Sequence, residues 1–536
     1  MGKSTKPRGT LSKHSNTQPR YALLSVFDKT GIADLARVLQ KVGYVIVSSG
    51  GTFDVLVRDG VKNVVPIDDI TKNPRDSFDG RMKTISFAVE SGILFDRDNP
   101  NHVAQAKKLG VPQVDVVVCN LYPFEKTLAK PGVTEEELIE KIDVGGPTMV
   151  DAAAKNYKSV LVLVDPSYYD EVSKRLATGS ITREFRKSLA GRAFNHLALY
   201  FAVVGGHYNT ERFPEEIALP LRRANILRYG ENLHQEGVLY ITPNTNSSLA
   251  KLEVLRGREL SETNIGDIAA GIETVRLFKE PAAVIIKHHT GCGIAEASTI
   301  AKALFMALEG DPESAFGGVV VTNRPLDLDT AQAIANFKKK KNSQMDIIAA
   351  PDISAEAIDL LGQVRKTTGV YRFGDISERR TEKWDVKCFN GVAVLQDWDD
   401  ALEASFKNWQ VVTKNHPTDK QLEQMRFAWK AVKAVKSNAV LVVDSDIKMT
   451  RGIGTGQTSR VRATNIALEQ AKDYTKNGIL ASDSFFPFND SVKKAAKYKI
   501  GAIIQQGGSI NDQASIDAAN EAGIPMVFTY NRAFRH

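Results

Sequence analysis

The chain has 536 residues, of which 43% are hydrophobic and 25% charged, so it is long enough for at least two domains with ordinary globular cores. No stretch approaches the roughly 20 consecutive apolar residues that a membrane span needs, which argues against a membrane protein. The three cysteines, Cys119, Cys292 and Cys388, are too widely spaced for CxxC pairs. This spacing argues against a disulfide framework and a zinc site, and it favours a reducing cytoplasm.

The basic charge is concentrated at the amino terminus. Residues 1–20 carry five basic residues and no acid, which leaves +2 of the net charge of +7 for the rest of the chain. Because this segment is rich in Ser, Thr and Pro and has no apolar run, we predict a disordered basic tail rather than a signal peptide or a nucleic-acid-binding region.

Residues 21–204 alternate short apolar runs with helical patterns. Strands are expected at 21–27, 44–49, 114–124 and 159–165, and helices near 31–41 and 182–202. Such alternation is typical of a parallel sheet with helices on both faces. Residues 205–222 contain glycines and prolines without periodicity, so we place a linker there and a second domain at 223–536.

Two strand-to-helix turns of the first domain carry small and polar residues. One turn holds Ser25 and Lys29, and the next, in VIVSSGGTFDVL, holds Ser49, Gly50, Gly51 and Thr52. Backbone N–H groups at a helix start bind anions, and glycine lets a phosphate approach closely. Either turn alone is compatible with an ordinary βα connection, but the two together favour a phosphorylated ligand.

Four reactive side chains follow at scattered positions: Lys83, Tyr122, Asp143 and Lys155. Each also has a structural interpretation, as a surface lysine, a core tyrosine, a helix cap or a solvated lysine. Spacing alone does not decide between these roles.

The second domain is also predicted to be α/β, from apolar runs at 283–286, 318–321, 439–443 and 501–504. The segments 440–471 and 500–523 share the order strand, glycine cluster, helix, and we interpret them as a weak internal duplication. The stretch VIIKHHTGCG ends a buried strand in Lys287, His288 and His289.

Taken in chain order, many segments resemble one known family. They are SVFDKTG, SSGGT, GRMKT, VVVCNLYPF, IDVGGPTMV, AAAKN, LRYGEN, IIKHHTGCG, SAFGG, MDIIAAP, VKSN, GIGTGQTSR, SDSFFPFND and RAFRH. Together they closely resemble the bifunctional purine-biosynthesis family that joins an AICAR formyltransferase to an IMP cyclohydrolase, over residues 21–536.

The resemblance implies an α/β fold: a methylglyoxal-synthase-like domain with a parallel sheet, then a larger transformylase domain of two cytidine-deaminase-like lobes. It implies formyl transfer from the co-substrate 10-formyltetrahydrofolate to AICAR, giving FAICAR, and dehydrative closure of FAICAR to IMP. It also implies a cytoplasmic homodimer that shares its transformylase sites between subunits.

Formyl transfer needs a group that takes a proton from the attacking amine and returns one to the departing folate nitrogen. The resemblance assigns this shuttle to His288 and the stabilisation of the oxyanion to Lys287. It leaves His289 structural and Cys292 a buried thiol. It implies substrate contacts at Arg228, Tyr229, Asn438, Arg460, Phe485, Asp490 and Arg532, and a folate side formed by Phe316, Gly317 and Asp346.

For ring closure, the resemblance implies catalytic roles for Lys83, Tyr122, Asp143 and Lys155, with Lys155 as the proton donor. It implies that the nucleotide is held by Ser25, Lys29, Ser49, Gly50, Gly51, Thr52, Arg81 and Thr84. No metal is expected, because the H-x-E and P-C-x-x-C set of a zinc deaminase is absent from the sequence. A nucleotide sensor, the other rival, has no need of Lys287 and His288.

Three departures from the family pattern bear on function. Gly291 stands in place of a proline, so the loop loses a fixed φ, and Asn489 stands in place of an arginine. The segment TISFAVESG (84–92) lacks two histidines and a proline. The alternative is therefore a transformylase whose degenerate cyclohydrolase domain only binds nucleotide. Because the four residues proposed for ring closure are all present, we favour a working cyclohydrolase.

Overall fold

The structure is a computed structural model that describes residues 19–74, 77–341, 343–378, 380–400 and 402–536. The chain divides into two compact units. The N-terminal unit extends to Arg222 and takes in Thr242–Asn244, and the C-terminal unit comprises Arg223–Ile241 and Thr245–His536. The predicted basic tail lies outside the described residues, apart from its last two positions.

The N-terminal unit is built on a five-stranded, entirely parallel sheet with the order β3-β2-β1-β4-β5. Its strands are β1 (Arg20–Leu24), β2 (Tyr44–Ser48), β3 (Val65–Pro66), β4 (Gln113–Val118) and β5 (Leu161–Leu163). The four predicted strands are present and are shorter than expected. The apolar run after β4, for example, turns at Pro123, which has no N–H for a ladder hydrogen bond.

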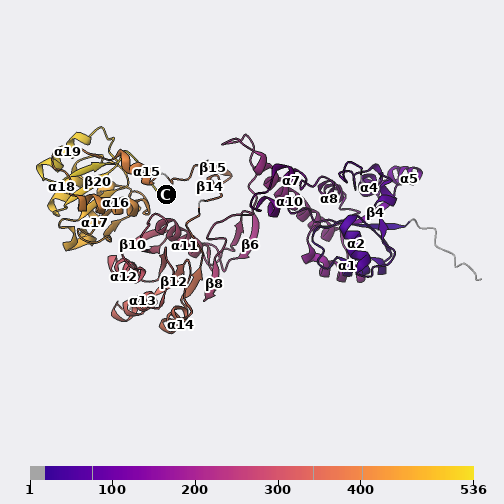
Figure 1. The fold of residues 1–536 in the computed structure, drawn as a ribbon, viewed down its shortest axis with the longest axis horizontal. Coiled ribbons are helices and arrows are strands. Elements are labelled where there is room, and N and C mark those ends of the chain that lie inside the picture. Colours follow the sequence, from indigo (N-terminus) through magenta and orange to yellow (C-terminus); the bar gives the residue numbers. More distant parts are fainter. Residues whose placement is uncertain (1–18, 75–76, 342, 379, 401) are drawn as a thin grey trace, which may run out of the picture. The chain divides into compact units, whose positions relative to one another are not determined.

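Helices cover both faces of this sheet (Figure 1). On one face α1 (Ile32–Lys41), α2 (Gly50–Arg58) and α9 (Tyr169–Ala177) share a core with the sheet. On the other face lie α4 (Phe87–Leu94), α8 (Gly145–Lys155) and α10 (Arg183–Tyr208). The remaining helices are α3 (Asp68–Thr71), α5 (Pro100–Leu109), α6 (Phe124–Leu128), α7 (Glu135–Ile139) and the 3-10 turn η1 (Pro166–Tyr168). Helix α10 runs into the predicted linker, because its apolar side chains continue past residue 202.

The C-terminal unit contains two six-stranded sheets, one in each of two lobes. The first has the order β10-β9-β11-β12-β13-β8 and the second the order β16-β21-β20-β19-β17-β18. The first comprises β8 (Glu253–Arg256), β9 (Ala282–Lys287), β10 (Thr290–Glu296), β11 (Gly318–Thr322), β12 (Met345–Ala350) and β13 (Gly369–Arg372). The second comprises β16 (Gln410–Val411), β17 (Val440–Val443), β18 (Thr450–Gly454), β19 (Ile479–Ser482), β20 (Ala502–Gln505) and β21 (Met526–Phe528).

The two lobes repeat one topology. In each, a helix leads into an antiparallel hairpin, and three further strands follow, each preceded by a helix. The helices of the first lobe are α11 (Glu262–Val275), α12 (Ile300–Gly310), α13 (Leu328–Lys341) and α14 (Ala355–Val364). Their counterparts are α16 (Asp419–Lys433), α17 (Arg460–Ala471), α18 (Asp490–Lys497) and α19 (Asp512–Glu521). The segments 440–471 and 500–523 do not repeat one another, because the first contains the hairpin β17–β18 and α17, whereas the second contains one strand, β20, and α19.

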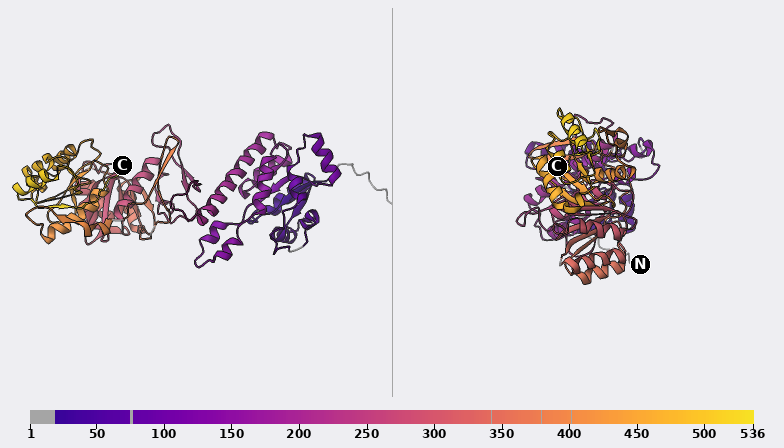
Figure 2. Two further views of the ribbon diagram at one scale, coloured as in Figure 1. Left: turned by 90° about the horizontal axis from the view of Figure 1, so that it is seen from above. Right: turned by 90° about the vertical axis from the view of Figure 1, so that its left-hand side faces the viewer.

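A shared apolar core joins the lobes, which lie side by side in Figure 2. Helices α11 and α16 contribute to it from between the two sheets, and Trp429 is its largest fully buried side chain. Helices α12–α14 cover the outer face of the first sheet and α17–α19 that of the second. The fold class predicted from the sequence is confirmed.

The smaller elements are two hairpins and three short helical turns. They are β6 (Arg222–Ile226) with β7 (Val238–Ile241), β14 (Asp385–Phe389) with β15 (Val392–Gln396), α15 (Leu402–Ser405), η2 (Phe406–Asn408) and η3 (Lys472–Thr475). Within the described part of the chain, no helix has the length and apolar character to span a membrane.

Helix α4 carries an unusual buried acid, Glu90. Both its carboxylate oxygens are buried and have no hydrogen-bond partner among the residues that the structure describes. Burial raises the pKa of Glu90 to about 7. The folded unit therefore holds Glu90 protonated at a pH where the unfolded chain has already ionised it.

We predict that Glu90→Gln removes a pH dependence of stability. The stability that protonated Glu90 contributes is present below pH 4.5, is lost progressively as the pH rises to about 7, and stays lost above it. Thermal unfolding at pH 5, 6, 7 and 8 should show that the Tm of the variant rises relative to the Tm of the wild type as the pH increases. The exposed Glu136→Gln of α7 is the matched control, and equal pH profiles for wild type and Glu90→Gln would contradict the prediction.

Candidate functional sites

The first candidate site lies at the turns that follow β1 and β2. These strands are parallel neighbours, so both turns emerge at the carboxyl edge of the sheet. The hydroxyl oxygens of Ser25 and Ser49 are 3.1 Å apart. The buried Thr52 hydroxyl donates to the Val26 carbonyl at 2.9 Å and accepts the Val26 N–H at 3.1 Å. Thr52 therefore ties the two turns together, and the serines face each other across them.

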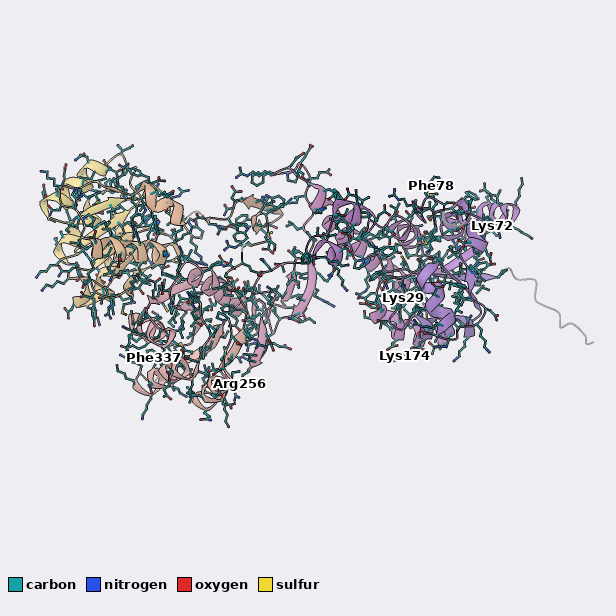
Figure 3. All side chains as sticks on the ribbon, in the orientation of Figure 1. Lys29, Lys72, Phe78, Lys174, Arg256 and Phe337 are labelled. Carbon is teal, nitrogen blue, oxygen red and sulfur yellow. The ribbon has the colours of Figure 1, made fainter. Side chains whose placement is uncertain are left out.

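Two lysines bring positive charge to these turns. Gly50 has a φ of +46°, and a Cβ built on it would lie 2.1 Å from Lys83 Nζ, so the ammonium sits against the first residue of α2. Lys29, labelled in Figure 3, donates to the Val26 and Phe27 carbonyls. Burial lowers the pKa of Lys29; Asp28 opposes this shift and the charge of Lys83 adds to it. Cations gathered at the positive end of a helix create a strong site for an anion.

Asp143 and Thr84 lie at the amino end of α8. Asp143 Oδ1 accepts the Gly146 N–H at 2.8 Å, and the Asp143 N–H donates to the Tyr200 hydroxyl at 2.7 Å. Burial raises the pKa of Asp143. A Cβ on Gly145 would lie 2.4 Å from Thr84 Oγ1, so Thr84 lies directly against the helix start.

Tyr122 stands beside Asp143. Its backbone N–H donates to the Asp143 carboxyl, and burial, with Asp143 as the next cause, raises the pKa of its phenol. Its ring is 5.7 Å from that of Phe27 in the turn after β1. The structure therefore brings Tyr122 and Asp143 to the same carboxyl edge as the turns of Ser25 and Ser49. Arg81 instead forms an exposed ion pair with Glu140.

Lys155 does not join this group. It is the exposed last residue of α8, and α8 leads back toward the start of the parallel strand β5. Eleven helical residues rising about 1.5 Å each span roughly 15 Å from the first Cα to the last. Within one chain Lys155 thus lies at the opposite edge of the sheet from Asp143, so the structure does not bring it to the other residues predicted for ring closure.

The second candidate site is a hollow of about 360 Å³ in the first lobe of the C-terminal unit. It is lined by Tyr229, Glu231, Asn232, Leu233, Ser261, Thr263, Asn264, Asp267, Lys287, His288 and Gly317. Strand β9 ends at Lys287, whose ammonium donates to the Phe316 carbonyl. His288 is exposed.

The other predicted folate-side residues lie at the same edge. A Cβ on Gly317 would lie 3.7 Å from Asp346 Oδ2, because Gly318 pairs with Met345 across β11 and β12. Asp346 forms an ion pair with Arg365. Arg228 donates to the Tyr229 hydroxyl at 2.6 Å, which puts its guanidinium beside the hollow.

Sequence reasoning missed Asp267. This residue of α11 is 7% exposed, and its Oδ1 accepts the His289 N–H at 2.7 Å. Burial raises the pKa of Asp267, and the hydrogen bond from His289 opposes that rise. The helix start carries a capping signature, Ser261 with Asn264, but that signature alone does not reveal what the helix contacts.

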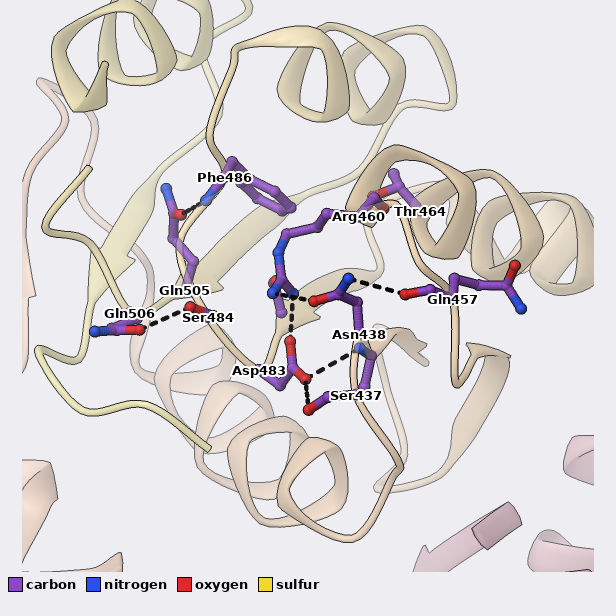
Figure 4. Close-up of polar contacts among 12 residues, drawn as sticks. Ser437, Asn438, Gln457, Arg460, Thr464, Asp483, Ser484, Phe486, Gln505 and Gln506 are labelled. Carbon is purple, nitrogen blue, oxygen red and sulfur yellow. Dashed lines mark hydrogen bonds and ion pairs between the residues drawn. The ribbon is translucent and has the colours of Figure 1, made fainter. Parts of the chain in front are cut away.

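A polar network in the second lobe holds two more predicted residues (Figure 4). Arg460 forms an ion pair with the fully buried Asp483, and donates to Ser482 Oγ at 3.0 Å and to Asn438 Oδ1 at 2.8 Å. Asp483 Oδ2 also accepts the Ala439 N–H at 3.1 Å. Sequence reasoning missed Asp483, because it assigned the substrate contacts of the segment SDSFFPFND to Phe485 and Asp490 alone.

The C-terminal tail returns to this network. The Ala533 N–H donates to the Asp483 carbonyl at 2.8 Å. The guanidinium of Arg532 lies 4.6 Å from the Phe534 ring centre, and that of Arg460 lies 6.0 Å from the same ring. The structure thus brings Asn438, Arg460 and Arg532 together.

Phe485 and Asp490 are placed at the margin of that group. Phe485 is half-buried beside Phe486, whose N–H donates to Gln505 at 2.7 Å. Asp490 begins α18 and accepts the Ser491 N–H at 2.7 Å.

The loop after β9 contacts the segment that leads to Asn438. Thr290 Oγ1 accepts the Lys436 N–H at 3.3 Å and lies 3.3 Å from Thr455 Oγ1. Burial raises the pKa of the Cys292 thiol to about 12, so Cys292 is not a thiolate at neutral pH. Among the residues that the structure describes, no cluster of three or more His, Cys, Asp or Glu side chains is placed to hold a metal ion.

Comparisons with known proteins match nearly the whole chain. A family model described as "MGS-like domain" matches residues 31–148, and one described as "AICARFT/IMPCHase bienzyme" matches residues 153–470. The bifunctional purine biosynthesis protein PurH of Persephonella marina is 44% identical over 528 residues, which cover 96% of this chain and 100% of that protein. The protein of the same name from a Thermoanaerobacter species is 43% identical, over 96% of this chain and 99% of its own length.

A solved structure titled "Crystal structure of ForH" is 34% identical over 35% of this chain and 95% of its own, with a TM-score of 0.32. The full-length similarity to the two PurH proteins and the match to the bienzyme model decide the class. The chain belongs to the AICARFT/IMPCHase bienzyme family.

The buried pair of Asp483 and Arg460 yields a prediction about stability. Asp483→Ala leaves a guanidinium unpaired in a site where Arg460 is 8% exposed, and the loss of one partner of a buried pair costs about 3–5 kcal/mol. Urea denaturation followed by tryptophan fluorescence should show the C-terminal unit unfolding at clearly lower urea. Asp446→Ala, which removes an exposed ion pair with Lys420, is the control and should shift the midpoint little. Equal midpoints for the two variants would refute this account of the network.

Proposed function

We propose that this chain catalyses the last two steps of IMP synthesis, with formyl transfer in the C-terminal unit and ring closure in the N-terminal unit. Family membership supports both activities. The observation that carries the proposal is the hollow in which Lys287 and His288 meet Tyr229 and Gly317. We further propose 10-formyltetrahydrofolate as the donor, no metal requirement, and a cytoplasmic homodimer without nucleic-acid or membrane partners.

In formyl transfer, the AICAR amine forms a bond to the formyl carbon, and the bond from that carbon to the folate nitrogen breaks. His288 takes the proton of the attacking amine and delivers one to the departing nitrogen. Lys287 stabilises the oxyanion of the tetrahedral intermediate. Its ammonium is oriented by the Phe316 carbonyl, beside the Gly317–Asp346 edge that we assign to the folate.

In ring closure, the carboxamide nitrogen of FAICAR bonds to the formyl carbon, and water then leaves. The cradle of Ser25, Ser49 and Gly50 suits the ribotide phosphate, with Lys29 and Lys83 supplying positive charge. Lys83 is also the lysine placed to stabilise the developing oxyanion. Asp143 and Tyr122, at the same edge, exchange the protons, and the burial that raises the pKa of Asp143 favours the protonated form of its carboxyl.

The alternative, a transformylase with a degenerate nucleotide-binding domain, is not favoured. The altered segment after Thr84 makes a regular helix start, in which Ser86 Oγ accepts the Val89 N–H at 3.2 Å. Thr84 itself still lies against α8. The loss of the two histidines therefore leaves the arrangement of Lys83, Tyr122 and Asp143 in place.

We predict that His288→Ala abolishes formyl transfer and leaves ring closure intact, because the shuttle lies in one unit and the closure site in the other. Transfer is followed by FAICAR formation from AICAR and 10-formyltetrahydrofolate, and closure by IMP formation from supplied FAICAR. His289→Ala is the comparison: its imidazole takes no part in the proton transfer itself, so this variant should lose less of the transfer activity than His288→Ala. If His289→Ala is the more damaging change, the assignment of the shuttle is wrong.

We predict that Lys83→Met lowers kcat for ring closure by about a hundredfold or more, the usual cost of removing one donor to an oxyanion. Lys155→Met, at the far end of α8, should change kcat by less than about threefold, because within one chain Lys155 lies at the opposite edge of the sheet from Asp143. Both are measured with saturating FAICAR, and formyl transfer in the same preparations reports on folding. A loss in Lys155→Met as large as in Lys83→Met would contradict the placement of the reaction at the carboxyl edge.

A further inference from the structure

The corner between β9 and β10, formed by His288 and His289, has an unusual backbone conformation. His288 has a φ of 53° and His289 a φ of 64°, a left-handed region that residues with a Cβ seldom adopt and rarely adopt in succession. Such a corner persists only where its surroundings hold it. Gly291 follows where the family pattern has proline, so the loop itself does little to fix the backbone.

Helix α11 makes two contacts with this corner through adjacent residues. Asp267 Oδ1 accepts the His289 N–H at 2.7 Å. A Cβ built on Gly266 would lie 2.3 Å from His289 Nε2 and 2.6 Å from Cε1. The imidazole of His289 therefore lies directly on the bare backbone of the helix at Gly266.

Packing, rather than hydrogen bonding, holds that ring. His289 Nε2 is buried and has no hydrogen-bond partner in the described part of the chain. The ring stays in place because Gly266 leaves room for it, while Asp267 fixes the amide of the same residue. Together the two contacts fix the backbone N–H and the ring of His289. They therefore also fix the direction in which the side chain of the preceding residue, His288, points.

We propose that Gly266 and Asp267 are positioning residues for formyl transfer, which hold His289 so that the His288 imidazole points into the hollow beside Lys287. This inference rests on the proposed role of His288 as the proton shuttle. It also assigns a function to His289, whose ring packs against α11 and so helps to position the turn that carries His288.

The test is a pair of compensating substitutions. Gly266→Ala adds a methyl group where the His289 ring lies, so the corner must move. Because a displacement of about 1 Å can cost up to a hundredfold in rate, kcat for formyl transfer should fall by at least about tenfold, while KM for AICAR changes by less than about threefold. Alanine is a better helix former than glycine, so the loss cannot come from a weakened α11.

Removing the ring should reverse this effect. In Gly266→Ala/His289→Ala the added methyl occupies space that the ring has vacated, and kcat should return to within about threefold of that of His289→Ala alone, as expected for two residues in direct contact. A merely structural role for Gly266 predicts no such recovery. Ring closure from supplied FAICAR, measured in each preparation, should match the wild type.

The contact of Asp267 is tested with a matched pair. Asp267→Asn keeps an oxygen that can accept the His289 N–H, so kcat should stay within about threefold of wild type; Asp267→Ala leaves the amide without this acceptor and should lose at least about tenfold. An equal loss in both variants would overturn the role of the hydrogen bond.

His288→Ala is the reference in the same assays. If His288→Ala lacks transfer but Gly266→Ala keeps the wild-type kcat, or the double variant is no better than Gly266→Ala, the positioning proposal is wrong and the shuttle assignment stands. If His288→Ala itself retains transfer, the shuttle assignment fails.

Discussion

The pairing direction of the strands determines where chemistry takes place in this molecule. Backbone hydrogen bonds fix which strand ends meet at one edge of a sheet. In the N-terminal sheet all the strands run in parallel, so the turns after β1, β2 and β4 open on a single edge. The turns of Ser25 and Ser49 share that edge with the Tyr122–Asp143 group for this reason, and α8 leads away from it to Lys155.

The C-terminal lobes follow the same constraint with a different result, because each begins with an antiparallel hairpin. In the first lobe Ile286 pairs with Val319, so β9 ends where β11 begins, and Lys287 meets Phe316. In the second lobe Val440 pairs with Ser482, so the segment before β17 meets the end of β19. Ser437 and Ala439, on either side of Asn438, thereby bond to Asp483. Two lobes with one topology thus carry their candidate site residues at opposite edges.

One position shows how the repeated lobes diverged in chemistry. Asn323, after β11, accepts the Ala282 N–H at 2.8 Å through Oδ1, and Asp483, after β19, accepts the Ala439 N–H at 3.1 Å through Oδ2. The neutral amide of Asn323 donates to the Phe278 carbonyl at 3.0 Å. The carboxylate of Asp483 pairs with Arg460 instead. An acid at this position allows the second lobe to bury a guanidinium, because a buried charge needs an opposite charge beside it.

The sequence by itself determined the properties that depend on neighbours along the chain: the alternation of strands and helices, the order of the two domains, the glycine-rich cradle and the strand that ends in Lys287 and His288. Fourteen short segments in order also sufficed to indicate the family. Only the tertiary structure decided what depends on pairing and packing between distant segments. It placed Lys155 at the far edge of its sheet and showed that the repeated unit is a whole lobe. It also revealed the roles of Asp267 and Asp483, whose partners lie 22 and 23 residues away along the chain. Local patterns specify which elements form, whereas the edge at which a side chain emerges depends on the direction in which its strand or helix crosses the sheet.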